Sequence, residues 1–412
     1  MPTFQAPKGT FDVLPPASAR YERLVSRFAG LVGRAGYGLL VSPMFEDVEV
    51  FRRVGESTDV VRKEMFDFED KGGRHVALRP EGTASVVRAY VEHRPQAPFK
   101  AWYVAPHFRH ERPQAGRYRQ HHQVGVEALG SADADLDVEV IALPAQLFRE
   151  LGLQRIRLRL TSLGDDTCRP AYREELLAYL RERQDQLCDE HQGRIEDNPL
   201  RVLDCKREAC RTATKDSPRM LDRLCDECAA HFDRVKAGLD ALGVTYDIDP
   251  TLVRGLDYYT RTTFEFEAQA LDSSQNGAGG GGRYDRLAEA MGGPPTPGIG
   301  FGLGIERILL ACDAEGVFGV PETTLDVFVI DTTGGETARD LTAALRAAGL
   351  RADRAWDNRS WKAQMKAAMH STAALAVVVE PERITIRTLR EKGEAETVDG
   401  ENVVDQVRKR LA

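Results

Sequence analysis

Arginine and tyrosine side chains that could bind a charged ligand stand directly before a strand-like run, in the sequence LVRGLDYYTRTTFEFE at residues 252–267. In the last residues of this run, phenylalanine alternates with glutamate, and a period of two predicts a strand with one buried face. Arg254, Tyr258 and Tyr259 are therefore expected at the beginning of a sheet strand, where side chains are held in place. This position favours a binding site over a solvated loop.

A second polar set lies in FKAWYVAPHFRHERPQAGRYRQHHQVGVEALG, residues 99–130, which predicts two strands joined by a Pro/Gly loop at 112–118. Alternate positions on the two strands place one group of polar side chains on a common face: Tyr103, His107, Arg109, Glu111, Arg119, His121, Gln123 and Glu127. Gly125 lies between them and leaves room. The alternative interpretation is a solvated face that carries salt bridges.

The stretch RPEGTAS at residues 79–85 precedes the helix-like run ASVVRAYV. Glu81 and Thr83 lie in the turn between them, where their side chains could cap the helix. Taken alone, the stretch favours capping over ligand binding.

Two glycine-rich stretches, GAGGGGRYD at 277–285 and GIGFGLGIERILL at 298–310, could let a ligand approach the main chain closely. A flexible loop is the alternative for the first. The second predicts a strand followed by a helix, with Arg307 in the first turns of that helix. The sequence has no GxxxxGK[ST] motif, and the glycines at 298–304 do not fit GxGxxG. A bound nucleotide would therefore be held by arginines and a sheet floor.

Length and composition fit a multidomain globular protein. A chain of 412 residues predicts two or three domains, and 42% hydrophobic with 29% charged residues is typical of soluble proteins with substantial cores. The net charge of −8 argues against a general nucleic-acid coat but permits a local basic face. No signal peptide or membrane span is predicted, and the odd count of seven cysteines fits reduced thiols in a cytoplasmic protein.

Changes of pattern along the chain predict three regions. Residues 165–245 consist of long charged helical runs and hold six of the seven cysteines, and the strand-like pattern returns at about residue 250. We therefore expect a helical insertion at 165–245 within a first domain that spans 1–320. Strands and helices alternate from about residue 322, which predicts a small α/β domain at 322–412 with a largely parallel or mixed sheet.

The cysteine spacing in the insertion is compatible with a metal site. Cys205-x4-Cys210 and Cys225-x2-Cys228, with His231 nearby, provide candidate ligands for tetrahedral zinc. The alternative is a set of reduced thiols buried between helices.

These motifs together resemble class II aminoacyl-tRNA synthetases, and specifically the histidyl-tRNA synthetase family, over essentially the whole chain. KGTFDVLP is similar to that family's opening, VSPMFEDVEVF to the first class II motif, FRHERPQAGRYRQHHQ to the second and GFGLGIERILL to the third. RGLDYYT, FEF and GGGRYD resemble signatures particular to the histidine enzymes. The resemblance implies an α+β catalytic domain with an antiparallel sheet, the helical insertion, and a C-terminal anticodon-binding-like α/β domain.

The resemblance also implies an activity and its partners. Histidine is joined to ATP to give histidyl-adenylate and pyrophosphate, and is then transferred to the 3′ end of its tRNA by a homodimeric enzyme. ATP is expected as its Mg²⁺ complex, with no tightly bound organic cofactor. By similarity, Arg254 and Arg109 hold the α-phosphate, Arg307 lies near the γ-phosphate and Glu111 lies near the adenine amino group.

The histidine-binding residues follow by similarity too. The substrate ammonium is expected on a carboxylate and its polar neighbours, and the imidazole between a carboxylate and tyrosines. The residues implied for these roles are Glu81, Thr83, Gln123, Glu127, Tyr258, Tyr259 and Tyr284. The hairpin-loop residues implied for the tRNA acceptor end are Arg112, Gln114, Arg117 and Arg119.

Two other functions fit parts of the sequence. A non-catalytic, histidine-binding regulatory paralogue of ATP phosphoribosyltransferase is related to this family, but it lacks the C-terminal domain and tends to lose the histidine-enzyme signatures. A plain nucleic-acid-binding module would not explain the glycine-rich and acidic clusters. The synthetase activity is therefore the leading expectation.

Overall fold

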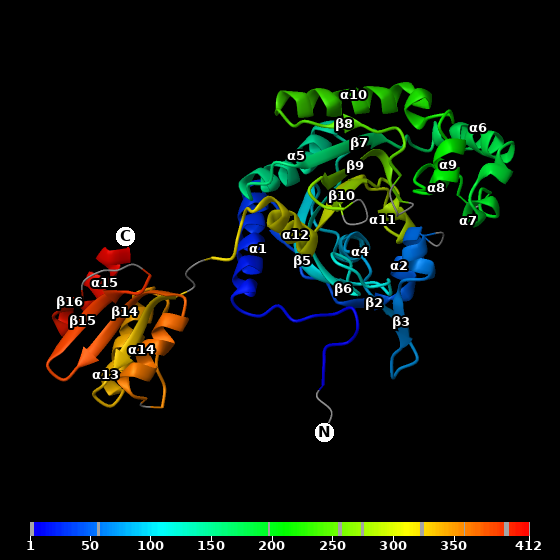
Figure 1. Cartoon of the computed structure of the whole chain (residues 1–412). Helices are drawn as coiled ribbons and strands as arrows, with labels where there is room; N and C mark the ends of the chain where they lie inside the picture. Colours follow the sequence, from blue (N-terminus) through cyan, green and yellow to red (C-terminus); the bar gives the residue numbers. More distant parts are fainter. Residues whose placement is uncertain are drawn as a thin grey trace. The chain divides into compact units, whose positions relative to one another are not determined.

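A computed structural model describes residues 4–55, 58–196, 198–253, 258–272, 276–321, 325–357, 359–390 and 395–411 (Figure 1). The chain divides into two compact units, one of residues 1–13 and 21–319 and the other of residues 14–20 and 320–412. Each unit has its own sheet and its own hydrophobic core.

Within the described residues, the larger unit is built on an eight-stranded sheet in the order β1-β5-β6-β11-β10-β9-β7-β8. Its strands are β1 (Gly38–Leu39), β5 (Phe99–Phe108), β6 (Gln120–Leu129), β7 (Ile156–Ser162), β8 (Asp247–Ile248), β9 (Thr260–Ala268), β10 (Gly277–Arg283) and β11 (Gly298–Gly304). Neighbouring strands run antiparallel except at the two edges, where β1 is parallel to β5 and β8 is parallel to β7. The predicted α+β fold on an antiparallel sheet is confirmed, with these parallel edges added.

Helices and a small second sheet complete this unit. One core gathers side chains from α1 (Ala17–Arg34), α5 (Ala134–Glu150), α10 (Asp226–Ala241) and α12 (Ile305–Glu315). Another gathers side chains from α2 (Val48–Gly55), α4 (Thr83–His93) and α11 (Leu287–Ala290). The small sheet has the order β2 (Phe45–Asp47), β4 (His75–Leu78) and β3 (Phe66–Glu69). The short helix α3 (Asp59–Arg62) comes just before β3 in the chain.

Strands β5 and β6 form the predicted hairpin, and the burial of its two faces explains its polar pattern. Tyr103 lies opposite Gly125, and His107 lies opposite His121. Tyr103 and His107 are buried, whereas the alternate residue Val104 is only partly buried. The polar face therefore points into the protein beneath α4, and the alternative of a solvated face is wrong for the strands themselves.

The helical segment between β7 and β9 is made of short pieces. Its elements before α10 are α6 (Arg169–Arg181), η1 (Gln184–Gln186), α7 (Asp189–Gln192), α8 (Leu200–Leu203), α9 (Glu208–Ala213) and η2 (Met220–Arg223). Their small core is distinct from the two cores of the sheet and includes four buried cysteines: Cys168, Cys188, Cys210 and Cys228.

The smaller unit has a mixed sheet, as predicted. Its order is β13 (Ala352–Arg354), β12 (Leu325–Asp331), β14 (Ala373–Glu380), β15 (Arg383–Thr388) and β16 (Glu396–Val398), the first three parallel and the last two antiparallel additions. Helices α13 (Glu336–Ala347), α14 (Trp361–His370) and α15 (Val403–Leu411), with the turn η3 (Gly400–Asn402), accompany it. Separate clusters of apolar side chains fill the two faces of this sheet.

None of the helices in the described part of the chain combines the length and the apolar character needed to cross a membrane.

A fully buried ion pair ties the sheet to α5. Arg283, the last residue of β10, pairs with Asp137, and both side chains are inaccessible to solvent. The same guanidinium donates to the carbonyl oxygen of Ser131 at 3.1 Å, to that of Asp133 at 3.3 Å and to Asp285 Oδ1 at 3.2 Å. Because Tyr284 directly follows Arg283, this network fixes the direction of the Tyr284 side chain.

Replacing Asp137 is expected to destabilise the larger unit strongly. Asp137→Ala removes the fully buried partner of Arg283 and leaves it with the partly exposed Asp285, and breaking a buried pair in this way typically costs about 3–5 kcal/mol of unfolding free energy. Urea unfolding followed by circular dichroism measures the change. The matched control is Asp135→Ala, on the same helix as Asp137, which removes an exposed ion pair with Arg234 of α10 and should change stability little. Equal effects of the two substitutions would contradict this role for Asp137.

Candidate functional site

A cavity of about 180 Å³ lies over the glycine-rich strands of the larger unit. Its lining residues are Arg109, Glu111, Gly116, Arg117, Tyr118, His121, Gln123, Glu265, Gly277, Ala278, Gly279, Gly302, Gly304, Glu306 and Arg307. The cavity thus brings together four residues that the sequence assigned to nucleotide or amino-acid binding: Arg109, Glu111, Gln123 and Arg307.

Two arginines in this cavity are anchored by main-chain carbonyls. Arg109 Nε donates to the carbonyl oxygen of Pro80 at 2.9 Å. Arg307 Nε donates to Gly116 at 2.9 Å, and its Nη1 donates to Gly277 at 2.7 Å. Among the described residues neither guanidinium has a carboxylate within ion-pairing distance, although burial lowers the pKa of Arg307. Two positioned guanidinium groups without a direct ion pair make the cavity suitable for an anion such as a phosphate, although carboxylates line it as well.

The carboxylate of Glu306 is a functional group that the sequence analysis missed. Both of its oxygens accept from the main-chain N–H of His122, at 2.9 and 3.1 Å, and Oε1 also lies 2.8 Å from His122 Nδ1. Glu306 therefore fastens the start of α12 to β6. Its position in the first turn of a helix after a glycine strand was visible in the sequence, but its partner was 184 residues away.

Further along the same face of β6, Glu127 is completely buried. Thr83 Oγ1 donates to Glu127 Oε1 at 2.7 Å, and the Tyr284 hydroxyl donates to Oε2. Burial raises the pKa of Glu127 to about 8, in opposition to these two hydrogen bonds. A carboxylate oxygen has two lone pairs, so Glu127 retains the capacity to accept an N–H from a ligand.

Tyrosine rings surround this carboxylate. The ring of Tyr258 lies 4.7 Å from that of Tyr259 and 5.9 Å from that of Tyr284, measured between centroids. Tyr103 covers Gly125, where a Cβ would lie 2.4 Å from its ring. Among the described residues, the buried Tyr258 hydroxyl has no partner of hydrogen-bonding geometry. A cluster of tyrosine rings around one buried carboxylate offers hydrogen-bonding groups and flat faces of the kind that suit a flat ligand with both a donor and an acceptor.

Two glycines on β11 let the Glu127 and Tyr284 side chains pack directly against that strand. A Cβ on Gly300 would lie 1.8 Å from Glu127 Oε2, and one on Gly298 would lie 2.3 Å from the Tyr284 ring. The glycines do leave space beside the strand, as predicted. At these two positions, however, side chains of the protein fill that space.

Glu81 performs the capping that the sequence predicted. Its carboxylate accepts from the N–H groups of Thr83 at 2.7 Å and Ala84 at 2.8 Å, at the first turn of α4. Burial nevertheless raises the pKa of Glu81. Capping and ligand binding are compatible here, because the cap holds Thr83 where its hydroxyl reaches Glu127.

Two histidines on the hairpin, the buried His107 and the half-buried His121, are poorly suited to proton transfer at neutral pH. Burial lowers the pKa of His121 to about 3, with further contributions from the charges of Arg109 and Arg307. Burial also holds the pKa of His107 well below its usual value. The lowered pKa makes each of these two imidazoles a weak base, so neither is suited to act as a general base.

The residues predicted to contact the tRNA acceptor end divide into two groups. Arg112, Gln114 and Arg117 are exposed on the loop between β5 and β6. Arg119 is only partly exposed, because its side chain packs over Gly9 and its Nε donates to the carbonyl oxygen of Glu111 at 3.3 Å. Arg254, predicted to bind the α-phosphate, lies outside the described residues.

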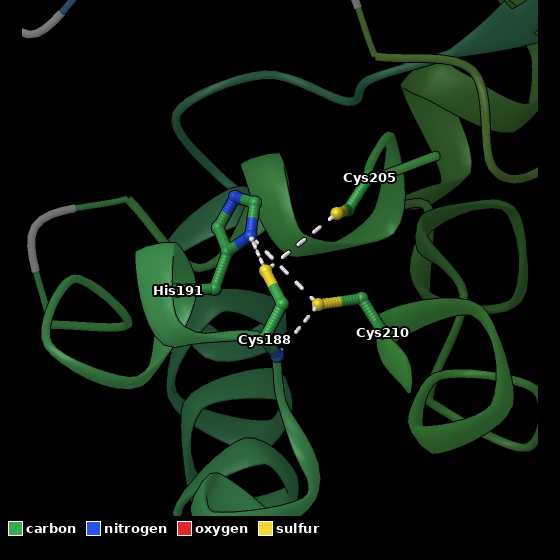
Figure 2. A group of neighbouring side chains, drawn as sticks. All are labelled: Cys188, His191, Cys205 and Cys210. Carbon is green, nitrogen blue, oxygen red and sulfur yellow. Dashed lines mark hydrogen bonds between the residues drawn. The ribbon is translucent and has the colours of Figure 1, made fainter. Parts of the chain in front are cut away.

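The predicted zinc ligands do not form one site. Two groups of metal-ligating side chains occur among the described residues: Cys188, His191, Cys205 and Cys210 (Figure 2), and Asp165, Cys168, Cys225 and Cys228. The prediction of a single Cys205, Cys210, Cys225 and Cys228 site is therefore wrong, because the first two cysteines gather with Cys188 and His191 and the last two gather with Asp165 and Cys168. His231 belongs to neither group, and its Nε2 lies 3.5 Å from Asp137 Oδ2.

The raised pKa of Glu127 predicts a specific pH dependence of stability. A folded pKa of about 8, above the unfolded value, means that the neutral form stabilises the fold at low pH and that this stabilisation is lost as the pH rises through 8. Between about pH 5 and about pH 8.5, the unfolding free energy of the ligand-free protein should fall relative to that of Glu127→Gln by on the order of 3 kcal/mol. Urea unfolding at a series of pH values tests this, and parallel profiles would refute it.

Comparisons with known proteins agree with the geometry. A histidyl-tRNA synthetase family model matches residues 9–308, and an anticodon-binding-domain model matches residues 326–410. The histidine–tRNA ligase of Rhodococcus erythropolis is 51% identical over 416 residues, which cover 98% of this chain and 97% of that protein. The histidine–tRNA ligase of Moorella thermoacetica is 48% identical over 414 residues, with 98% and 97% covered.

Solved structures give the same result. The apo histidyl-tRNA synthetase of S. aureus matches with a TM-score of 0.82 at 35% identity, covering 98% of this chain and 100% of that chain. A Bacillus halodurans protein described as an ATP phosphoribosyltransferase regulatory subunit/histidyl-tRNA synthetase matches with a TM-score of 0.65 at 20% identity, over 92% of this chain and 100% of that one, which concerns the fold alone. The chain belongs to the histidyl-tRNA synthetase family.

Proposed function

We propose that this protein is a histidine–tRNA ligase, which joins histidine to ATP with release of pyrophosphate and then transfers histidine to the 3′-terminal adenosine of its tRNA. The observation that best supports the proposal is that one face of β6 carries residues of two neighbouring sites. Glu127 lies within the tyrosine cluster, which we propose as the amino-acid site and call the tyrosine-walled pocket, and Gln123, on the same face, lines the cavity that holds Arg109 and Arg307. An amino acid in the pocket would thus present its carboxylate to a phosphate in the cavity.

The tyrosine-walled pocket binds the imidazole and ammonium groups of histidine. Glu127 accepts an imidazole N–H, while Thr83 and Tyr284 hold the carboxylate in place. The free Tyr258 hydroxyl bonds the other ring nitrogen. Glu81 and Gln123 provide the polar neighbours of the ammonium. A site that hydrogen-bonds both sides of its substrate rejects analogues lacking those groups by roughly 10⁴–10⁵-fold.

The activation step is a displacement at the α-phosphorus of ATP. A carboxylate oxygen of histidine forms the new bond to phosphorus, and the bond to the pyrophosphate oxygen breaks. The substrate supplies the nucleophile, so the protein contributes position and charge. Arg109 and Arg254 bind the α-phosphate, Arg307 binds the γ-phosphate, and Glu111 accepts from the adenine amino group.

Magnesium that arrives with ATP would neutralise phosphate charge. The carboxylates of Glu265 and Glu306 line the same cavity and are the oxygen ligands that Mg²⁺ prefers.

The tRNA contacts lie on the hairpin loop and on the smaller unit. Arg112, Gln114 and Arg117 are exposed for the acceptor end. On the smaller unit, the Arg354 guanidinium lies 4.3 Å from the Trp356 ring, and Trp356 is 56% exposed. An exposed aromatic ring beside an arginine suits stacking with an unpaired anticodon base.

The proposed location of the protein is the cytoplasm, where these substrates occur. Cell fractionation can check this.

Histidine-dependent ATP–pyrophosphate exchange, measured beside tRNA charging, tests the proposal. The wild type should exchange with histidine alone among the amino acids. Arg109→Ala should lose at least ~10²-fold in exchange rate, because each charge-assisted hydrogen bond to phosphate contributes about 1.5–3 kcal/mol. Arg254→Ala should behave in the same way.

Arg112→Ala is the matched control, because this arginine is exposed on the same loop. It should keep the exchange rate and lose tRNA charging, as should Trp356→Ala. A folded wild type that binds histidine but gives no ATP–pyrophosphate exchange would indicate a regulatory protein and would contradict the proposed ligase activity. Exchange that survives Arg109→Ala would sink only the assigned role of that arginine.

A homodimer is the proposed assembly. Apolar side chains on the segment 39–45 are unusually exposed: Leu39 at 56%, Val41 at 85%, Met44 at 51% and Phe45 at 55%. Part of this segment is the stretch that resembles the dimer-forming first class II motif, and several exposed apolar side chains on one short segment favour an interaction surface. Light scattering should give the mass of two chains for the wild type and of one chain for Val41→Asp. A monomeric wild type would contradict the assembly.

A further inference from the structure

The helical insertion has little hydrophobic core for its length. Three of its elements, α7, α8 and α9, contain four, four and six residues. Cysteines supply four of the buried residues of its core. Helices this short are not stable by themselves, and small cores of this kind are commonly stabilised by disulfides or metal ions. All seven cysteines of the chain are free, so disulfides do not serve here.

Four potential ligand atoms converge in this core from three separate turns (Figure 2). His191 Nδ1 lies 3.1 Å from Cys188 Sγ and 3.8 Å from Cys210 Sγ, and Cys188 Sγ lies 4.0 Å from Cys205 Sγ. All four atoms lie within 4.8 Å of one another. The side chains point toward a common centre in Figure 2.

These separations bracket those between the ligands of a tetrahedral metal ion, and they are too long for a disulfide. Zinc bonds of about 2.3 Å to sulfur and about 2.0–2.1 Å to nitrogen place tetrahedral ligands roughly 3.5–3.8 Å apart. A disulfide would require sulfurs about 2.05 Å apart. The sequence spacing, Cys188-x2-His191 followed by Cys205-x4-Cys210, supplies ligands in two close pairs, as structural zinc sites do.

We propose that Cys188, His191, Cys205 and Cys210 bind a structural zinc ion. All four positions of a tetrahedral ion are filled by protein, so the site is closed and has no place for a substrate. Three thiolates and one imidazole are also the soft and borderline ligands that select zinc over magnesium or calcium.

Interactions around the four side chains hold the ligand turns together. The main-chain N–H of Cys188 donates to Cys210 Sγ at 3.3 Å, a bond that orients and stabilises a metal-bound thiolate. Glu190, which lies between Cys188 and His191 in the chain, forms an ion pair at 3.3 Å with Arg207, which lies between Cys205 and Cys210. Arg207 also carries charge opposite to the net −1 expected of Zn²⁺ with three thiolates.

The second group of ligands is not included in the proposal. Its carboxylate, Asp165, is already bonded by Arg261 at 3.1 Å and by the N–H of Thr167 at 3.0 Å. These bonds, rather than a metal, account for the position of the Asp165 side chain.

Metal analysis of the full-length protein, purified under reducing conditions without added chelator, tests the site. Elemental analysis is expected to give zinc in the wild type and to show that Cys205→Ser has lost one equivalent. The matched control is Cys225→Ser, a substitution of equal chemistry and similar burial in the other group, which should leave that equivalent in place. Zinc retained by Cys205→Ser, or lost equally from both variants, would overturn the assignment.

X-ray absorption at the zinc edge of the wild type decides the ligand set without a variant. The expected first shell is three sulfurs and one imidazole nitrogen. Four sulfurs would indicate a site mixed from both groups, and three sulfurs with a carboxylate oxygen would indicate the second group, so either result refutes the proposal. A wild type that contains no zinc and takes up neither Zn²⁺ nor Co²⁺ would show that the four side chains are ordinary reduced residues. None of these outcomes depends on the ligase activity.

Discussion

The buried carboxylate of Glu127 is the constraint on which the larger unit depends. An ionisable group without solvent exposure needs hydrogen-bond partners, and Thr83 and Tyr284 provide them. Separate interactions position each partner. Glu81 caps the helix that begins at Thr83, and the ion pair of Arg283 holds the end of the strand just before Tyr284. The elements around β6 are thus positioned to satisfy one acidic side chain.

The same side chains serve the fold and the proposed chemistry. Glu81 caps α4 and lies beside the pocket, and Arg307 bonds two main-chain carbonyls while it lines the cavity. Such double use means that the proposed ligand-binding groups are held in place before a ligand arrives, which reduces the entropy lost on binding. It also means that loss of activity in a variant at these positions must be separated from loss of folding.

Local patterns predicted much of this molecule, and distant contacts account for the remainder. The period-two alternation of residues 99–130 correctly placed Tyr103 and His107 on one face, and the position of Glu81 before an apolar helix predicted its capping role. The Glu306–His122 bonds and the Arg283–Asp137 pair join residues 184 and 146 positions apart, which no local spacing reveals. The cysteines were misassigned for the same reason: spacing identified each close pair but could not show which pairs meet.

The sheet also determines how freely the insertion can vary. The chain leaves β7 and returns to β9 at neighbouring points, where Leu163 N–H donates to Arg261 at 2.8 Å and Arg261 N–H donates to Gly164 at 2.7 Å. Helix α10 and strand β8 belong to the sheet's own core and edge, because α10 packs in the main core and β8 pairs with β7. The pieces from α6 to η2 have a separate core, so a change in their length affects the sheet mainly through loop-closure entropy, which grows by only about 0.6 kcal/mol for each doubling of length. Natural selection could therefore enlarge, shorten or exchange this module while the strands on either side of it kept their pairing.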